Sequence, residues 1–299
     1  MSYIQELQER ADAFIAQIEK KEEKIIAESR KIALLQKYQG DDKIIDSLSR
    51  VEYLKTVARP ETFKTGLQSL DEATGGGISP GHLISLTGGT KNGKTAFAKF
   101  IMRHMEELAP VFFSFEETPD ELLRKEMEWG NKIPKFYFPQ TYERSDDLDW
   151  ISDKILESIL KNGTKVVFID HIYFLIDYAD NKERFDLKML EVVKRVKVIA
   201  KTLNVAVVLL CHLKKTPTDR APGIEDVADS RAIPQWSDKL WMIWREQERD
   251  KLGKTTVSDI TNLYVALDRQ TGISKNISLK FDRGAYSEYV SDFVEEKDF

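Results

Sequence analysis

The chain has 299 residues, of which 41% are hydrophobic, so it can bury a full core in one or two domains. It has no apolar run of the roughly 18 residues that a membrane span needs and no signal-peptide profile, so we expect a cytoplasmic protein without a membrane partner. A net charge of −5 means that any nucleic-acid binding would need a local basic patch, and the single cysteine, Cys211, excludes an internal disulfide and a cysteine-based zinc site.

Residues 1–40 have apolar side chains at alternating spacings of three and four, a heptad pattern that predicts a long helix ending near Gly40. The pattern is interrupted where the core positions Lys21 and Glu28 are polar. The segment either joins subunits as a coiled coil or helical hairpin, or packs as a solvated helix on its own domain. Its apolar core positions are Ile4, Leu7, Ala11, Phe14, Ile18, Ile25, Ile32 and Leu35.

Residues 41–60 are predicted to form a connecting helix and a linker. Helical spacing recurs over residues 44–57 and stops before Pro60, because the residue that precedes a proline is pushed out of helical geometry. Residues 61–299 form the third predicted part of the chain.

This third part alternates continuous apolar runs with helical stretches, which predicts an α/β fold whose mostly parallel sheet is covered on both faces. A helix is expected over residues 96–108, and antiparallel strands joined by short polar turns should close the sheet at its C-terminal edge. The predicted parallel strands are residues 83–86, 111–115, 166–169 and 205–211, and the antiparallel ones are residues 239–244, 261–267 and 277–281.

A complete phosphate-loop sequence, G-x-x-x-x-G-K-T, lies between the first predicted strand and the helix that follows it. In this context backbone N–H groups around Gly93 can wrap phosphates, Lys94 can reach the β and γ oxygens, and the Thr95 hydroxyl can bind Mg²⁺. The chain is therefore predicted to bind a nucleoside triphosphate. The residues expected to hold it are Gly88, Gly89, Asn92, Gly93, Lys94, Thr95 and Ala96.

Polar side chains follow the other predicted parallel strands, at the edge of the sheet where ligands of α/β proteins bind. Asp170 is expected to hold Mg²⁺ together with Thr95. Glu116 is our choice for the general base that polarises the attacking water, with Glu117 as the alternate. His212 is expected to contact the γ-phosphate and report its loss to the following loop, although an isolated histidine is often only structural.

The loop after His212 is polar and locally basic. Lys214, Lys215 and Arg220 could contact a nucleic-acid backbone there, or the loop could simply be solvated. No aromatic residue lies between these cations, so base stacking is not predicted.

With these motifs in chain order, residues 62–290 resemble the RecA-like ATPase domain of DnaB-type replicative helicases and of the related phage ring helicases. The resemblance implies ATP and Mg²⁺ between subunits of a six-membered homo-oligomeric ring, with single-stranded DNA in its pore. The motifs that carry it are T-G-L-Q-S-L-D from Thr65, S-F-E from Ser114, D-H-I from Asp170, C-H-L from Cys211, and A-I-P-Q-W-S-D from Ala232, the most discriminating of the set.

The resemblance also implies roles for arginines. Arg269 matches the arginine finger that completes the site of a neighbouring subunit, although the family's lysine two residues earlier is Leu267 here. Arg245 matches an arginine that lies near the nucleotide in some members. In the DNA-contacting loop the family's arginine position is Ala228 and its glycine position is Arg231, which could take over a phosphate contact.

Other functions fit part of the pattern. The S-F-E-E-T-P sequence from Ser114 is also similar to KaiC-like and RadA-like proteins, in which the ATP state controls partner binding without unwinding. A coiled-coil assembly protein with a structural nucleotide is a third hypothesis. The A-I-P-Q-W-S-D motif favours the helicase. The paired glutamates, the leucine at position 267, the acidic net charge and the altered DNA-contacting loop favour the switch.

Overall fold

The computed structural model describes residues 3–37, 44–58, 61–140, 146–176, 184–213, 221–227, 231–249 and 255–289. The chain divides into an N-terminal unit, Met1–Arg59, and a core unit, Pro60–Phe299. Within the described residues, none of the helices combines the length and apolar character that crossing a bilayer requires.

In its described residues the N-terminal unit has two helices, α1 (Tyr3–Lys37) and α2 (Ser47–Thr56). Asp46 caps α2, because its side chain accepts hydrogen bonds from the backbone N–H groups of Leu48 and Ser49. The long N-terminal helix is as the sequence predicts, and its expected end at Gly40 lies outside the described residues. The large apolar side chains described on both helices are exposed, among them Phe14, Ile25 and Leu54.

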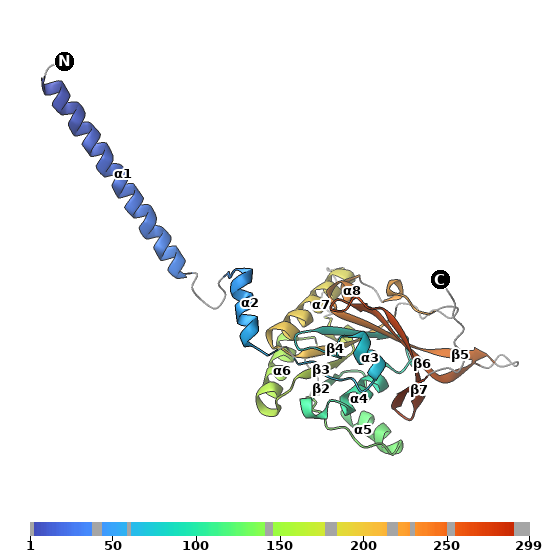
Figure 1. Cartoon of the computed structure of the whole chain (residues 1–299). Coiled ribbons are helices and arrows are strands. Elements are labelled where there is room, and N and C mark those ends of the chain that lie inside the picture. Colours follow the sequence, from blue (N-terminus) through green and yellow to red (C-terminus); the bar gives the residue numbers. More distant parts are fainter. Residues whose placement is uncertain are drawn as a thin grey trace. The chain divides into compact units, whose positions relative to one another are not determined.

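The core unit is built on a mixed sheet, which has eight strands in the described residues, ordered β2-β3-β4-β1-β5-β6-β7-β8. The first five strands in this order are parallel and the last three antiparallel (Figure 1). This confirms the predicted α/β fold. The strands are β1 Leu83–Gly88, β2 Val111–Ser114, β3 Val166–Asp170, β4 Ala206–His212, β5 Lys239–Arg249, β6 Thr255–Asp268, β7 Lys275–Asp282 and β8 Ala285–Glu288.

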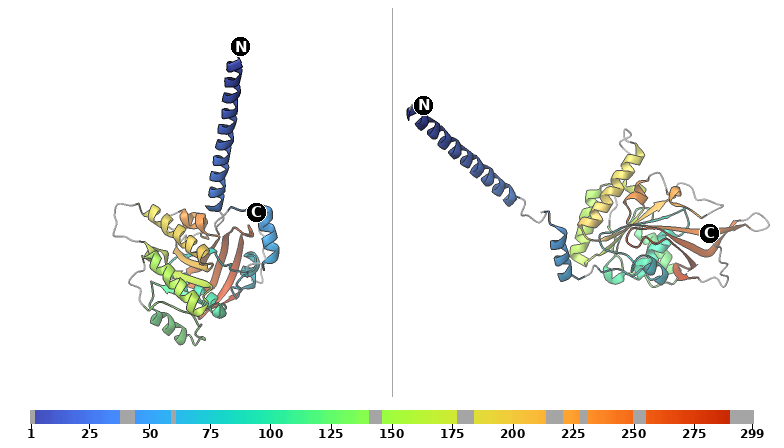
Figure 2. Two further views of the ribbon diagram at one scale, coloured as in Figure 1. Left: turned by 90° about the vertical axis from the view of Figure 1, so that its left-hand side faces the viewer. Right: turned by 45° about the horizontal axis from the view of Figure 1, so that its top comes forward.

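Helices cover both faces of this sheet, as its apolar strands require (Figures 1 and 2). Alternate strand residues face opposite ways, so Ile84 and Phe168 join one core while Leu83 and Val167 join the other. The first core includes residues of α3 (Gln68–Ala73), α4 (Lys94–Arg103) and α5 (Pro119–Glu128), and the second those of α6 (Leu148–Asn162), α7 (Phe185–Thr202) and α8 (Ala232–Trp236).

Several element boundaries differ from the prediction. The helix after the phosphate loop ends at Arg103, and only a short 3₁₀ turn, Glu106–Leu108, continues it. Strand β8 was missed because Tyr286 is its one buried residue, which leaves no alternating pattern in the sequence. Strand β5 runs on to Arg249 through polar residues that carry no apolar signal.

Candidate active site

The phosphate loop connects β1 to α4. Gly93 has a left-handed backbone (φ 89°) and caps α4, and its carbonyl accepts a hydrogen bond from Phe97 N at 2.8 Å. Gly88 lies so close to β5 that a Cβ there would come within 2.6 Å of the Ile243 carbonyl oxygen. Glycine is needed at both positions, by backbone conformation in one and close approach in the other. The loop thus directs the free N–H groups of the first turn of α4 toward an anion site.

Lys94 lies at the centre of the loop and is buried. Its Nζ donates to the carbonyl oxygens of Gly88 and Gly89, at 3.1 and 3.2 Å, and lies 3.2 Å from His212 Nδ1. Burial lowers the pKa of Lys94, and the nearby carboxylates of Asp170 and Glu116 oppose this shift.

Thr95 and Asp170 meet as the sequence predicts. The Thr95 hydroxyl donates to Asp170 Oδ2 at 2.6 Å. Burial raises the pKa of Asp170 to about 6, and the hydrogen bond from Thr95 acts in the opposite direction. Asp170 Oδ1 is buried and has no hydrogen-bond partner among the described residues. A hydroxyl and a carboxylate with an uncommitted oxygen are hard donors of the kind that Mg²⁺ prefers.

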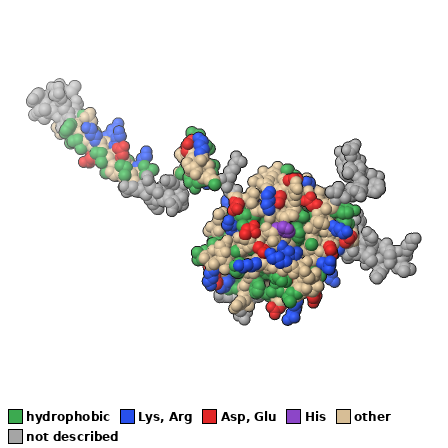
Figure 3. Space-filling view, turned by 60° about the horizontal axis from the view of Figure 1, so that its bottom comes forward, with side chains coloured by type: hydrophobic (Ala, Val, Ile, Leu, Met, Phe, Trp, Pro, Cys, Tyr) green, Lys and Arg blue, Asp and Glu red, His purple; other side chains and the backbone are tan. Residues whose placement is uncertain are grey.

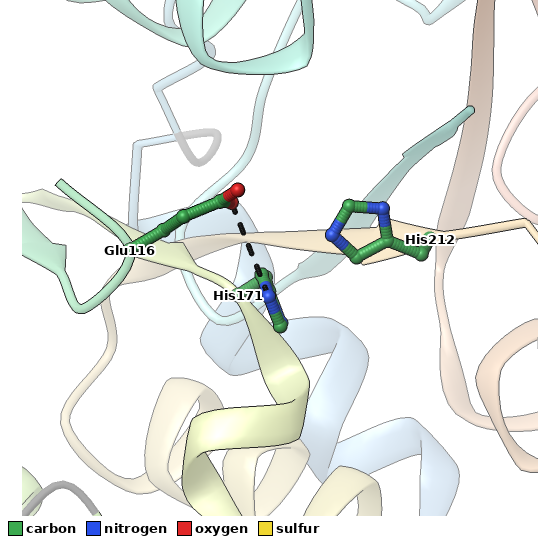
Figure 4. A group of neighbouring side chains, drawn as sticks. All are labelled: Glu116, His171 and His212. Atoms are coloured by element: carbon green, nitrogen blue, oxygen red, sulfur yellow. Dashed lines mark ion pairs between the residues drawn. The ribbon is translucent and has the colours of Figure 1, made fainter. Parts of the chain in front are cut away.

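Glu116, His171 and His212 form a cluster (Figure 4), and His212 lies next to Lys94. They come from the carboxyl ends of β2, β3 and β4, and their nearest ligand atoms all lie within 4.8 Å of one another. His171 Nε2 is 3.9 Å from Glu116 Oε2. Burial lowers the pKa of both histidines to about 4, with Lys94 adding to the effect. The sequence reasoning missed His171, although its position directly after Asp170 was a signal.

Glu117, the alternate base, turns away from this cluster. Its carboxylate forms an ion pair with Lys125 of α5. The next residue, Thr118, caps α5 through a capping box with Glu121. Glu116, with a half-exposed side chain, is therefore the carboxylate that faces the histidines.

Arg245 and Tyr286 lie beside the phosphate loop. The Arg245 backbone N–H lies 3.4 Å from Asn92 Oδ1, while its guanidinium donates to the Ser258 carbonyl at 2.9 Å. Tyr286, which the sequence reasoning missed, donates from its hydroxyl to the Gly93 carbonyl at 3.3 Å and packs edge-on against Phe97. These contacts hold the loop between α4 and the antiparallel strands.

Arg269 lies at the opposite end of the sheet. Its guanidinium donates to the carbonyl oxygens of Ser237 and Gln235 at the C-terminal end of α8, both at 2.8 Å. Strand β5 runs from Lys239, beside this arginine, to Ile243, beside Gly88. That is about 13 Å at roughly 3.3 Å per residue, so Arg269 does not join the phosphate loop of its own chain.

The A-I-P-Q-W-S-D motif serves the scaffold around Arg269. Asp238 Oδ2 accepts a hydrogen bond from Leu83 N at 2.7 Å, and the carboxylate pairs with Lys197 of α7. The next residue, Lys239, forms a fully buried ion pair with Asp268, with Nζ and Oδ2 2.6 Å apart. The motif therefore fixes the start of β1 and β5 and the end of α8.

The predicted nucleic-acid contacts are only partly described. Lys214, Lys215 and Arg220 lie outside the described residues. Arg231 is exposed at the N-terminal end of α8. Positive and negative side chains are interspersed over the face in Figure 3, so the described residues there form no extended basic surface.

A strand, phosphate loop and helix in this order, with a carboxylate at the end of β3, define a P-loop fold of the RecA-like type. Residues 143–290 match the family model of the DnaB-like helicase C terminal domain. These residues are thus similar to a DnaB-like helicase C-terminal domain, and the chain shows distant homology to replicative DNA helicases. This similarity agrees with nucleotide binding at the phosphate loop.

Named relatives agree with this assignment. Replicative DNA helicase DnaB of Leifsonia xyli is 25% identical over 259 residues, which cover 76% of this chain and 55% of the relative. The chain therefore spans about half the length of that relative.

Solved structures match the fold. The ATPase domain of G40P gives a TM-score of 0.67 at 19% identity, covering 84% of this chain and 100% of that one. A KaiC-like protein from Pyrococcus horikoshii gives 0.58 at 18% identity, covering 78% of this chain and 100% of that one. At these identities the matches show the RecA-like fold alone.

Proposed function

We propose that this chain is an ATP-dependent ring-shaped motor that hydrolyses ATP between its subunits and translocates on single-stranded DNA. The observation that carries the proposal is the division of polar groups between the two ends of the sheet. Lys94, Asp170, Glu116 and His212 meet at the carboxyl end, whereas Arg269 lies at the amino end. The site would be completed in a ring in which the amino end of the sheet in one subunit lies against the carboxyl end of the sheet in the next.

The phosphate loop would bind the triphosphate. Backbone N–H groups from Gly88, Gly89, Asn92, Gly93 and Ala96 would surround the phosphates, and Lys94 would exchange its carbonyl contacts for phosphate oxygens. Arg245, next to Asn92, would approach the nucleotide from β5.

Thr95 and Asp170 would hold Mg²⁺, which neutralises charge on the phosphate oxygens when bound. Glu116 would accept the proton of the attacking water, since it is the strand-end carboxylate that is not paired with Lys125. His212 would contact the γ-phosphate from the end of β4.

Arg269 of one subunit would act on the phosphate loop of the next. Its guanidinium is oriented by the carbonyl groups at the end of α8, so little side-chain freedom is left to lose when it meets the γ-phosphate. A finger fixed in this way would also report the state of the neighbouring site to α8.

The N-terminal helices would hold the subunits together. Leu48, Val51 and Leu54 form an exposed apolar stripe on α2, and α1 exposes those core positions of its heptad pattern whose side chains are described, from Phe14 to Leu35. A second copy of the chain is the partner that a homo-oligomeric ring, expected to be hexameric, would supply.

DNA binding is expected from the loops that follow β4 and precede α8. Lys214, Lys215, Arg220 and Arg231 are the cations available there for phosphate contacts. The name of the relative, a replicative DNA helicase, supports single-stranded DNA as the track.

ATPase activity with and without single-stranded DNA tests the proposal, on a sample whose mass is measured with nucleotide bound. We expect a ring mass, several-fold stimulation by DNA, and loss of both basal and stimulated activity in Lys94→Ala. Hydrolysis that is indifferent to DNA and RNA would contradict the motor and favour the alternative, a KaiC-like or RadA-like ATPase switch.

A further inference from the structure

The Glu116, His171 and His212 cluster has the composition of a metal site, but its hydrogen bonds favour another use. The His171 Nδ1 accepts a hydrogen bond from the backbone N–H of Tyr173 at 3.2 Å. A ring nitrogen that accepts carries no proton, so the proton of the neutral imidazole is on Nε2. This is the nitrogen that faces Glu116 Oε2.

His212 is held in the same way. Its Nδ1 lies 3.2 Å from the Lys94 Nζ, and an ammonium group can only donate. The His212 proton is therefore also on Nε2, and Figure 4 shows a ring nitrogen of His212 turned toward Glu116 and His171.

These tautomers present N–H groups to the centre of the cluster, whereas a metal ion needs lone pairs. A metal-bound histidine normally donates from its second nitrogen, but here the second nitrogen of each ring accepts. The cluster thus suits a carboxylate and the oxygens of a substrate better than a cation.

We propose that His171 is a positioning residue for Glu116: its Nε2–H holds one carboxylate oxygen so that the other faces the attacking water. The inference rests on the proposed function of Glu116 as general base. Among the described residues, His171 is the one basic side chain within 4.0 Å of the Glu116 carboxylate. The separation of 3.9 Å closes to a hydrogen bond through a small rotation of the half-exposed Glu116 side chain, as catalytic contacts do when substrate binds.

His171 also has a structural role, which uses its other nitrogen. It precedes the 3₁₀ turn Ile172–Leu175 and caps it through Nδ1. Asparagine can place an acceptor near the position of Nδ1, and glutamine can place an N–H near the position of Nε2. The two roles can therefore be separated by substitution.

Steady-state ATPase kinetics and thermal unfolding of His171→Asn and His171→Gln, in the full chain, test the proposal. We expect His171→Asn to lower kcat about tenfold, with KM for ATP and the unfolding temperature unchanged, because it loses a hydrogen bond to a charged group. His171→Gln should recover most of kcat while unfolding at a lower temperature. Wild-type kcat in His171→Asn, or equal loss of kcat in both variants, would overturn the proposal.

Glu116→Gln separates this inference from the function on which it rests. If Glu116→Gln retains turnover, the proposed general base is wrong. If it is inactive while His171→Asn turns over like wild type, only the positioning role fails.

Calorimetric titration with Zn²⁺ tests whether the histidines present N–H groups rather than lone pairs to the centre of the cluster. We expect no difference between wild type and His171→Asn, and tight binding that the substitution abolishes would overturn the donor assignment.

Discussion

The two ends of the sheet in the core unit hold their charged groups in opposite states. At the carboxyl end, Asp170, His171 and His212 have shifted pKa values, and Asp170 keeps a buried oxygen without a described partner. At the amino end, Lys239 is paired with Asp268, and Arg269 donates through Nε and Nη2 to carbonyl groups. The first arrangement is typical of a site prepared for a ligand, and the second of a rigid support.

The largest effect on ATP turnover is expected at Arg269, the residue of the amino end that would act in hydrolysis. Arg269→Ala should lower ATP turnover about 10³-fold, as loss of an arginine finger does, while affinity for a fluorescent ATP analogue stays within about threefold. Stopped-flow binding and steady-state hydrolysis measure the two quantities. Turnover near that of wild type would mean that the arginine only caps α8.

The amino end of the sheet can be destabilised by breaking its buried ion pair. Lys239→Met leaves the Asp268 carboxylate buried without its partner, so the free energy of unfolding should fall by about 3 kcal/mol in urea denaturation. Lys280→Met, at an exposed position of β7, is the matched control and should change it by less than about 0.5 kcal/mol. Equal effects of the two substitutions would contradict a stabilising role for the buried ion pair at this end of the sheet.

At the ligand end, Glu116→Gln should lower turnover about 10²-fold with nucleotide binding retained, because the water loses its proton acceptor. Glu117→Gln, whose carboxylate pairs with Lys125, is the control and should lose less than about threefold. A larger loss in the control would move the general base to Glu117.

A smaller effect is expected from pH. The pKa of His212 is about 4 in the folded state, below its ordinary value near 6.5, because of burial and Lys94. Between these values the unfolded chain binds more protons, so this contribution to stability is present above pH 6.5 and is lost as the pH falls.

The contribution of His212 to the pH dependence of stability is small because its side chain is partly exposed to solvent. His212→Gln should reduce the loss of unfolding free energy between pH 7 and pH 5 by about 1 kcal/mol. Urea denaturation at the two pH values measures this difference. An unchanged pH dependence in the variant would show that His212 is not held neutral by its surroundings.

Much of the site's arrangement could be predicted from the sequence, since each predicted residue follows a continuous apolar strand. Parallel strands bring their carboxyl ends to one edge, so Lys94, Thr95, Glu116, Asp170 and His212 had to lie near one another. The roles of these residues stay predictions.

The remaining features depend on tertiary contacts that no local pattern carries. Tyr286 reaches Gly93 from a strand with a single buried residue, and the His171 tautomer depends on one backbone N–H. The hydrogen bond from Arg269 to the Ser237 carbonyl at the end of α8 joins residues more than thirty positions apart. Sequence spacing gave no signal for any of these contacts.

The central claim is that the two ends belong to one site shared between subunits. Co-expressed Lys94→Ala and Arg269→Ala chains test it most directly, because only a mixed ring can place an intact phosphate loop against an intact arginine. With random mixing, about one quarter of the interfaces would be complete, so ATPase activity should rise to about that fraction of wild type. Activity no higher than that of either variant alone would contradict the shared site.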